Sequence, residues 1–407
     1  MEGQPQSVLI VDDALLYRRL LAGLLRQWGY RIYEAENGEQ ALALLAQETV
    51  SLVISDWEMP IMDGLTLCHE IRQQVQDRYI YIIVLTARDS VEDLRVGFAA
   101  GADDFLPKPV NQVELRARLH AGERILQLEA SLASKNRRLS EALAQIEQDL
   151  QAAATLQRSI LPPHHLCQGD YFADWLFMPS AWVSGDLFHL FPLNEKAVGF
   201  YCVDVAGHGV TAAMMSVAVA RQFLHGRTVD PFLFDGAALT PPAQVVRLLN
   251  ERFCAQHSDV TSYFTLVYGV LDRHSGEGRL CQAGHPTPLV VSTTGEVRGI
   301  GQGGPPVGLF DHLDWEESAF HLAPGERLCL YSDGISECES GEGEMFGAAR
   351  LRTLLASLHD QPLATLLARV EQSLTQWRGA AASAADDISL LVIERQQRLQ
   401  QEINDEA

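Results

Sequence analysis

Short apolar runs alternate with helical stretches over residues 8–122, and this alternation restricts the fold more than any other feature. The runs VLIV, SLVIS and IYIIVLT are separated by stretches of helical period, such as ALLYRRLLAGLLRQWG and GEQALALLAQE. Strands that are apolar on both faces suit a parallel sheet with helices on both sides. The pattern predicts a doubly wound α/β domain at residues 1–122 with a five-stranded parallel sheet.

Polar residues stand where the predicted strands end. Asp12 and Asp13 end the first strand, Asp56 ends the third, Thr86 ends the fourth, and Lys108 follows the fifth. Ligand sites of open α/β sheets lie beyond the carboxyl ends of the strands, so these side chains should meet. Three carboxylates that meet repel one another unless a hard cation such as Mg²⁺ lies among them. With Mg²⁺, Lys108 can neutralise a phosphoryl group on Asp56, and the Thr86 hydroxyl can hydrogen-bond it. The sequence therefore predicts Asp56 as a phosphoacceptor.

Residues 7–122 resemble the response-regulator receiver family through the motifs VDDA, SDWEMPIMDG, LTA and DDFLPKP. The resemblance implies a flavodoxin-like fold and a sensor histidine kinase as phosphodonor. It also implies an acid pair of Asp12 and Asp13, a metal contact from the Glu58 backbone carbonyl, a switch pair of Thr86 and Phe105, and a cis bond between Lys108 and Pro109.

Residues 123–161 contain no glycine or proline and are rich in Leu, Ala, Gln, Glu and Arg, which predicts one long helix. Two apolar seams run along it, one at Ile125, Leu132, Leu139, Ile146, Ala153 and Ile160, and one at Asn136, Leu143 and Leu150. If the first seam occupies heptad position d, Asn136 lies at position a, where a buried Asn favours a parallel pair of helices. We expect a parallel homodimer through this coiled-coil linker. A helix packed on its own domain is the alternative.

Residues 162–395 have a different pattern, in which short strands are broken by Gly and Pro. Two helical stretches, near 210–225 and 347–377, interrupt the strands, and the last strand is ISLLVIE. The pattern predicts an α+β domain. The polar tail at 396–407 should be frayed.

Acidic residues of this second domain stand at turns beside small residues. They are Asp186 in VSGDLF, Asp204 in YCVDVAGHG, Asp333 in LYSDGI, and Asp386 and Asp387 in AADDISLLVI. An Asp beside a buried strand is costly unless it is liganded, and a neighbouring Gly lets the backbone approach an ion. The set suggests two divalent cations, Mn²⁺ or Mg²⁺, that generate hydroxide and stabilise displacement at phosphorus. The sequence has no P-loop, G-x-S-x-G elbow or C-x5-R signature, so water should be the nucleophile.

With LQRSILPP, YFTLVYGVLD, QAGHPTPLVV and GGPPVGL, these motifs resemble the SpoIIE branch of the metal-dependent (PPM, PP2C-like) protein phosphatases over residues 150–395. The resemblance implies a β-sandwich flanked by helices. It also implies a serine/threonine phosphoprotein phosphatase whose substrate is a phosphorylated anti-sigma-factor antagonist.

The same resemblance assigns metal ligands. Asp186, Asp204 and the Val205 carbonyl would hold the bridging metal region, and Asp333 and Asp386 the second metal. Asp387 is the less favoured ligand of its pair. Two positions depart from the family pattern, Ser184 in place of Gly and His189 in place of an acidic residue. His208 and His285 are candidate general acids, although their Gly-flanked loops favour a role in backbone geometry.

The chain carries 31 basic and 53 acidic residues, a formal net charge of −22. Long-range repulsion therefore opposes binding to nucleic acid or to an anionic membrane. Its seven cysteines are scattered without a C-x-x-C pair, which argues for reduced core residues. Residues 1–7 do not resemble a signal peptide, and the apolar runs are of strand length, so we expect a cytoplasmic protein.

Two functions fit the sequence. The first is a two-component response regulator whose phosphatase output is controlled by phosphorylation of Asp56. The second is a non-catalytic dimeric regulator that binds a partner through a phosphatase-like domain.

Overall fold

The computed structural model describes residues 6–75, 78–87, 91–207, 209–225, 232–256, 262–379 and 386–396. His208 and most of the polar tail lie outside these ranges. The chain forms two compact units, residues 1–144 and 145–407. None of the described helices is long and apolar enough to cross a membrane.

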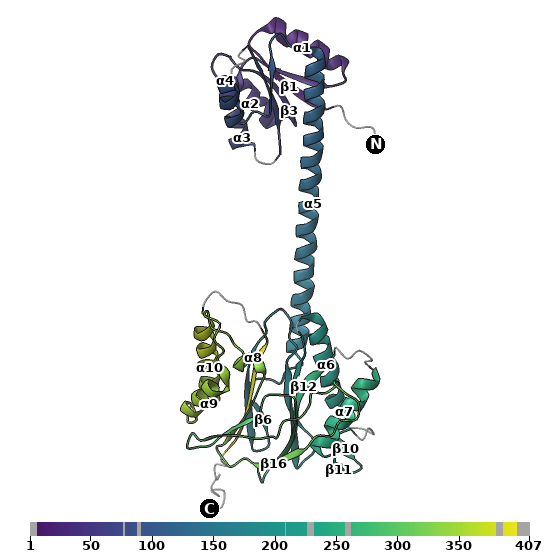
Figure 1. The fold of residues 1–407 in the computed structure, drawn as a ribbon, viewed down its shortest axis with the longest axis vertical. Helices are drawn as coiled ribbons and strands as arrows, with labels where there is room; N and C mark the ends of the chain where they lie inside the picture. Colours follow the sequence, from purple (N-terminus) through teal and green to yellow (C-terminus); the bar gives the residue numbers. More distant parts are fainter. Residues whose placement is uncertain are drawn as a thin grey trace, which may run out of the picture. The chain divides into compact units, whose positions relative to one another are not determined.

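The first unit is built on a five-stranded parallel sheet of order β2-β1-β3-β4-β5, as predicted (Figure 1). Its strands are β1 (Ser7–Val11), β2 (Arg31–Ala35), β3 (Leu52–Asp56), β4 (Tyr81–Thr86) and β5 (Asp104–Pro107). The intervening helices are α1 (Leu15–Gln27), α2 (Gly38–Gln47), α3 (Gly64–Gln74) and α4 (Val91–Ala99).

Both faces of this sheet are buried, which explains why its strands read as continuous apolar runs. Val8 and Ile10 of β1 pack with Leu21 of α1 on one face. Leu9 of β1 packs with Leu67 of α3 on the other. The predicted fold class is confirmed.

Helix α5 (Gln112–Arg158) joins the last helix of the first unit and the predicted linker into one continuous element. It begins eleven residues before residue 123, where the predicted linker starts, and ends at Arg158. Nothing between Gln112 and Arg158 interrupts it, because that span contains no Pro and only Gly122.

The burial of α5 varies along its length. Near its start, Leu119 is fully buried in the core of the first unit. In the middle, Leu132, Leu139 and Ile146 are 54%, 60% and 55% exposed. Near its end, Ala154 is buried against Val183 and Ala213. The two ends therefore pack on their own units, and the middle of the seam stays exposed.

Ile160, the last predicted seam residue, corrects the heptad prediction. It lies beyond the end of α5 and packs against the core of the second unit.

Two antiparallel sheets form the second unit, in the orders β16-β13-β12-β9-β8 and β15-β14-β17-β18-β7-β6. The strands of the first sheet are β8 (Leu187–Pro192), β9 (Ala197–Val205), β12 (Phe264–Asp272), β13 (Glu277–Ala283) and β16 (Glu317–His321). Those of the second are β6 (Leu166–Gln168), β7 (Tyr171–Met178), β14 (Leu289–Val291), β15 (Val297–Gly299), β17 (Arg327–Tyr331) and β18 (Ile388–Arg395). A small hairpin of β10 (Phe234–Asp235) and β11 (Ala238–Leu239) stands apart.

Helices flank the two sheets on their outer sides, which confirms the predicted sandwich (Figure 1). α6 (Val210–His225) and α7 (Pro242–Gln256) cover the first sheet. α9 (Gly347–Ser357) and α10 (Leu363–Arg378) cover the second, and a short α8 (Asp333–Ser336) follows β17.

Two helix predictions for this unit were wrong. The stretch near 347–377 is two helices, because Pro362 stands between them and a proline cannot continue a helix interior. α7 was missed, although Pro242 fits the first position of a helix. The buried residues Val245, Leu249 and Phe253 recur every four positions and were the available signal.

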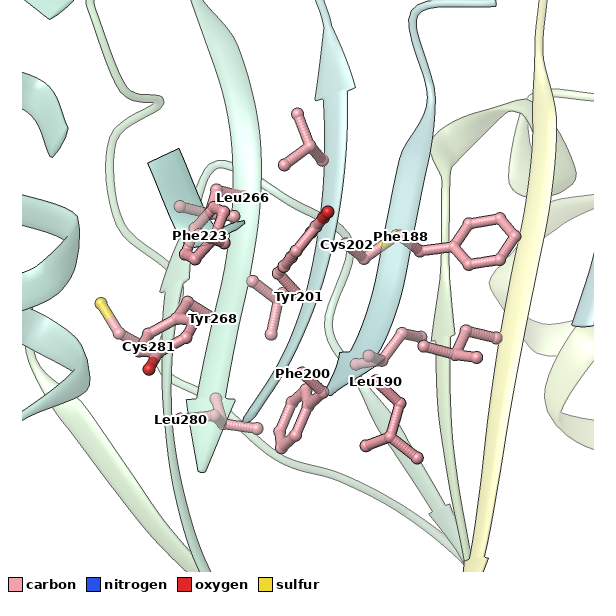
Figure 2. Packing of buried hydrophobic residues seen from close by; sticks show 14 of the residues in the cluster. Phe188, Leu190, Phe200, Tyr201, Cys202, Phe223, Leu266, Tyr268, Leu280 and Cys281 are labelled. Atoms are coloured by element: carbon pink, nitrogen blue, oxygen red, sulfur yellow. The ribbon is translucent and has the colours of Figure 1, made fainter. Parts of the chain in front are cut away.

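Side chains of β9 alternate between the two faces of the first sheet (Figure 2). Phe200 and Cys202 lie on the side of the second sheet, as does Phe188 of β8. Tyr201 lies on the opposite side and stacks on Phe223 of α6, with ring centroids 4.4 Å apart. Because Asp204 follows Cys202 by two residues, it faces the space between the sheets.

Candidate functional site

The predicted phosphoacceptor cluster lies at the carboxyl edge of the parallel sheet. Carboxylate oxygens of Asp12, Asp13 and Asp56 lie within 4.8 Å of one another. Lys108 Nζ lies 2.8 Å from Asp12 Oδ2 and 2.7 Å from Asp56 Oδ2. The structure thus brings four residues from three separate loops to one point.

The positive charge of Lys108 partly compensates the negative charge of Asp12 and Asp56. Burial raises the pKa of Asp56, and the hydrogen bond from Lys108 opposes that rise. Burial also opposes the charge of Lys108, but its hydrogen bonds to Asp12 and Asp56 outweigh burial, and the pKa of Lys108 is raised. The lysine therefore stays protonated and compensates part of the acidic charge.

The predicted switch residues flank the cluster. Thr86 ends β4 and is buried, and Phe105 is buried with its ring edge-on to Phe98 at 4.8 Å. A Cβ atom on Gly97 would come within 2.3 Å of the Phe105 ring, so the glycine leaves space for it. The Lys108–Pro109 bond is cis, as the resemblance implied.

Five aspartates of the second unit stand at the ends of strands in both sheets. Asp186 precedes β8, and Asp204 lies near the end of β9. Asp333 begins α8 directly after β17, and Asp386 and Asp387 precede β18. Both sheets therefore contribute to one acidic edge.

Asp186 is the most unusual of these carboxylates. It is fully buried, and neither of its oxygens accepts a hydrogen bond of ordinary geometry among the described residues, although the nearby hydroxyls of Ser332 and Ser389 act to lower its pKa. Burial, and then the charge of Asp204, raise its pKa well above the ordinary range. A buried carboxylate without a positively charged partner is strongly unfavourable, so the site favours a bound cation.

The pKa values of the neighbouring Asp204 and Asp333 are raised as well. Burial, followed by the charges of Asp333 and Asp386, raises the pKa of Asp204 to about 8. Burial and the charge of Glu337 raise the pKa of Asp333. Within the described part of the chain, no lysine or arginine forms an ion pair with Asp186, Asp204 or Asp333. This donor set fits divalent cations, which prefer carboxylate oxygens.

Gly185 keeps the backbone close at this edge. A Cβ atom there would lie 3.0 Å from the carbonyl oxygen of Val205, the group that the resemblance assigns to a metal. Any larger residue at position 185 would crowd that carbonyl.

Both carboxylate oxygens of Asp387 accept hydrogen bonds from the protein itself. Its Oδ1 accepts hydrogen bonds from the backbone N–H of Ser180 (2.7 Å) and from the Ser180 hydroxyl (2.9 Å). Its Oδ2 accepts one from the Gly185 N–H at 2.8 Å. This bonding favours Asp386 as the ligand of the pair and gives Asp387 the task of holding the loop before Asp186.

Gln157, near the end of α5, reaches the same loop and was missed as a site residue by the sequence reasoning. Its Oε1 accepts from the Ser184 N–H at 3.0 Å, and its Nε2 donates to the Ser184 carbonyl at 2.5 Å. The Ser184 hydroxyl in turn accepts from the Asp186 N–H at 3.0 Å. A buried glutamine inside the motif LQRSILPP was the available signal.

His189 and His285, which the sequence singled out, both have lowered pKa values. Burial lowers the pKa of His189, whose Nδ1 lies 2.9 Å from the Leu190 carbonyl. His285 is 3% exposed, its Nδ1 lies 2.7 Å from Thr265 Oγ1, and burial lowers its pKa to about 3. A neutral, enclosed imidazole such as that of His285 is a poor candidate for a general acid.

Comparisons with known proteins agree with this division. The profile of the response regulator receiver domain matches residues 8–120, and that of stage II sporulation protein E (SpoIIE) matches residues 194–396. The chain is a receiver domain fused to a SpoIIE-type, PP2C-like phosphatase domain.

Curated relatives match the receiver. The response regulator MprA of Mycolicibacterium vanbaalenii is 43% identical over 117 residues, which are 29% of this chain and 50% of that protein. A probable transcriptional regulator, ycf27 of Porphyra purpurea, is 40% identical over 121 residues, 30% of this chain and 49% of that protein. The chain thus spans about half the length of the curated relatives it matches.

A solved structure matches the second domain. The SiaA-PP2C domain of Pseudomonas aeruginosa aligns with a TM-score of 0.54 and 23% identity, covering 62% of this chain and 98% of that domain. At this identity the likeness supports the fold of the domain.

Proposed function

We propose that this chain is a response regulator whose output is the metal-dependent hydrolysis of phosphoserine or phosphothreonine in a protein. The observation that carries the proposal is the fully buried carboxylate of Asp186, which lies beside Asp204 and has no basic partner among the described residues. A domain that only bound a partner would gain nothing from retaining such a costly group. The non-catalytic reading is therefore the weaker one.

In this proposal Asp186 and Asp204, with the Val205 carbonyl, hold the bridging metal region, and Asp333 with Asp386 holds the second cation. Bound there, Mn²⁺ or Mg²⁺ would lower the pKa of water and stabilise charge on a phosphoryl group. The protein's own part is to hold these oxygens at the ends of strands of two sheets, without a lysine or arginine paired to Asp186, Asp204 or Asp333 among the described residues. Asp387 supports this by anchoring Gly185 to the start of β18.

The receiver controls the output through Asp56. The sensor kinase would transfer a phosphoryl group to this carboxylate, with Mg²⁺ held by Asp12, Asp13, Asp56 and the Glu58 carbonyl. Lys108 already contacts Asp56 and is placed to compensate phosphoryl charge. Thr86 and Phe105, the switch pair, would then change position in response to the phosphoryl group and alter the surface of the receiver.

Helix α5 is the element that we propose transmits this change. Its exposed middle seam, with Asn136 at position a, would pair with the same helix of a second chain in parallel. Its last turn holds the Asp186 loop through Gln157. A shift in the pairing of α5 would thus act directly on the backbone of a metal-ligand loop.

For the substrate we propose a phosphorylated anti-sigma-factor antagonist, on the support of the SpoIIE family match. The test is release of phosphate from such a phosphoprotein by the full chain with Mn²⁺ or Mg²⁺. Asp204→Ala should abolish release. If the wild-type chain releases no phosphate from any phosphoserine or phosphothreonine protein, or if the variant matches it, the proposal fails.

A further inference from the structure

His285 lies between the two sheets at the edge that carries the acidic cluster. It follows Gly284, which has a φ of 70° and directly succeeds β13. Its Nδ1 lies 2.7 Å from the hydroxyl of Thr265 on β12. Thr265 is the register partner of Asp204 on the neighbouring strand β9. Residues opposite each other in an antiparallel pair project to the same face, so Thr265 and Asp204 lie side by side.

The other edge of the His285 ring faces the second sheet. Its Nε2 is buried beside the backbone of Tyr331 and makes no hydrogen bond of ordinary geometry. Tyr331 ends β17, and Asp333 follows two residues later. One imidazole thus stands between a strand next to Asp204 and the strand that leads to Asp333.

The backbone of His285 is itself held firmly. Its carbonyl accepts a hydrogen bond from Gln282 Nε2 at 2.6 Å, and Gln282 Oε1 accepts from the Gly303 N–H at 2.9 Å. The Gly284 N–H donates to the Gly304 carbonyl at 2.8 Å. Because its backbone is fixed and its ring lies between Thr265 of β12 and Tyr331 of β17, His285 is suited to set the distance between these strands.

We propose that His285 is a positioning residue that sets the spacing of Asp204 and Asp333, and so the affinity of the phosphatase domain for its cations. The inference rests on the proposed function. Thr265 orients the ring by donating its hydroxyl to Nδ1, which leaves the proton of the neutral ring on Nε2. His285 is only 3% exposed, so its ring supplies shape and polarity, not a proton.

The test is Mn²⁺ titration calorimetry on the full chain, together with thermal unfolding in chelator. The variants are His285→Ala, Thr265→Val, which keeps the volume but removes the hydroxyl, and the double variant. His285→Asn offers an oxygen to Thr265 and serves as the conservative replacement. Leu366→Ala in the fully buried core of α10 is the control for lost stability alone.

Outer contacts of metal ligands typically contribute about 10- to 100-fold in metal affinity, so each single variant should weaken Mn²⁺ binding within that range. The double variant should bind Mn²⁺ no more weakly than the worse of the two single variants, since both single variants remove the same contact between Thr265 and His285. His285→Asn should recover part of the loss, and Leu366→Ala should lower the melting temperature without changing Mn²⁺ affinity.

Two results would overturn the inference while leaving the proposed function intact. One is Mn²⁺ affinity within twofold of wild type in both His285→Ala and Thr265→Val. The other is a fall in kcat with unchanged Mn²⁺ affinity and an altered pH profile, which would make His285 a general acid. If the wild-type chain binds no Mn²⁺, the proposed function and this inference fall together.

Discussion

The two acidic clusters of this chain solve the same electrostatic problem in different ways. In the receiver, Lys108 lies within 2.8 Å of two of the carboxylates and compensates part of their charge. In the phosphatase domain, Asp186 has no lysine or arginine partner among the described residues, and burial raises the pKa of Asp204 to about 8. A lysine compensates the first cluster before any ion binds, whereas the second is relieved by taking up protons.

This difference matches the tasks that we propose for them. A phosphoacceptor must exist in two states, with and without its phosphoryl group, so a resident lysine that stabilises both is useful. A hydrolytic centre that holds two cations throughout its cycle needs no resident counter-charge, and a lysine there would compete with the metals. Compensation by the protein itself thus distinguishes a switch from a catalyst.

The largest expected effect comes from Asp204→Asn, which should separate activity from stability. Loss of a ligand carboxylate should lower phosphatase activity by more than the ~100-fold seen for outer contacts of metal ligands. In chelator the same variant should melt at a higher temperature than wild type, because folded Asp204 must either carry an uncompensated charge or hold a proton that the unfolded chain releases. Steady-state kinetics and thermal unfolding of the same preparations measure both. A variant less stable than wild type in chelator would contradict the idea that the cluster is uncompensated.

A pH series gives the next largest effect. The pKa of Asp204 is raised to about 8, so the folded chain keeps a proton that the unfolded chain loses near pH ~4. The stabilising contribution of that proton is complete below pH ~4 and is lost as pH rises through about 8. In chelator, the melting-temperature gap between Asp204→Asn and wild type should therefore widen with pH. Mn²⁺ affinity should rise by roughly tenfold per pH unit below pH ~8 if one proton is released.

The receiver cluster should respond in the opposite sense to loss of charge. Lys108→Met removes hydrogen bonds to Asp12 and Asp56, and hydrogen bonds to charged groups contribute about 1.5–3 kcal/mol each. We expect the free energy of unfolding to fall by about 2 kcal/mol in chelator, by denaturant titration. Beryllofluoride should no longer change phosphatase activity in this variant. Equal stability of Lys108→Met and wild type would remove the contrast between the two clusters.

Gln157→Ala tests whether the end of α5 supports the acidic cluster of the phosphatase domain without affecting the receiver. The change leaves the N–H and carbonyl of Ser184 unpaired, a cost of about 1–3 kcal/mol. Phosphatase activity should fall several-fold, and receiver phosphorylation should be unchanged. Gln145→Ala, on the exposed part of the same helix, is the matched control and should have no effect on either reaction.

The smallest expected effect comes from Asn136→Leu. A buried Asn specifies a parallel dimer at some cost in stability, so Leu should loosen register or shift the oligomeric state. Sedimentation measures the state, and the activity ratio with and without beryllofluoride measures the coupling. If neither changes, the seam of α5 has no part in pairing or transmission.

Much of this arrangement could be predicted from the sequence, because strand ends and charged residues coincide in it. Asp12, Asp56 and Lys108 follow apolar runs of a parallel sheet, and such ends meet at one edge by topology. The boundary between the receiver's last helix and the linker was less accessible, since α5 runs through it and the sequence carries no break there.

The roles of Gln157, Asp387 and His285 could not be predicted in the same way. Each depends on contacts between residues far apart in the chain, 27 positions for Gln157 and Ser184 and 202 for Asp387 and Gly185. No local pattern encodes such pairs. Their residue types are compatible with many buried positions, and only the sandwich brings them to the acidic edge.

The most direct test of the account is phosphate release from a phosphoserine protein by the full chain with Mn²⁺, measured with and without beryllofluoride on the receiver. Because the account couples a switch at Asp56 to a catalyst at Asp186 and Asp204, it predicts Mn²⁺-dependent release whose rate changes when Asp56 is occupied. It also predicts that Asp56→Asn removes the change and keeps the release. Release that is absent with Mn²⁺, or identical in the two receiver states, would contradict it.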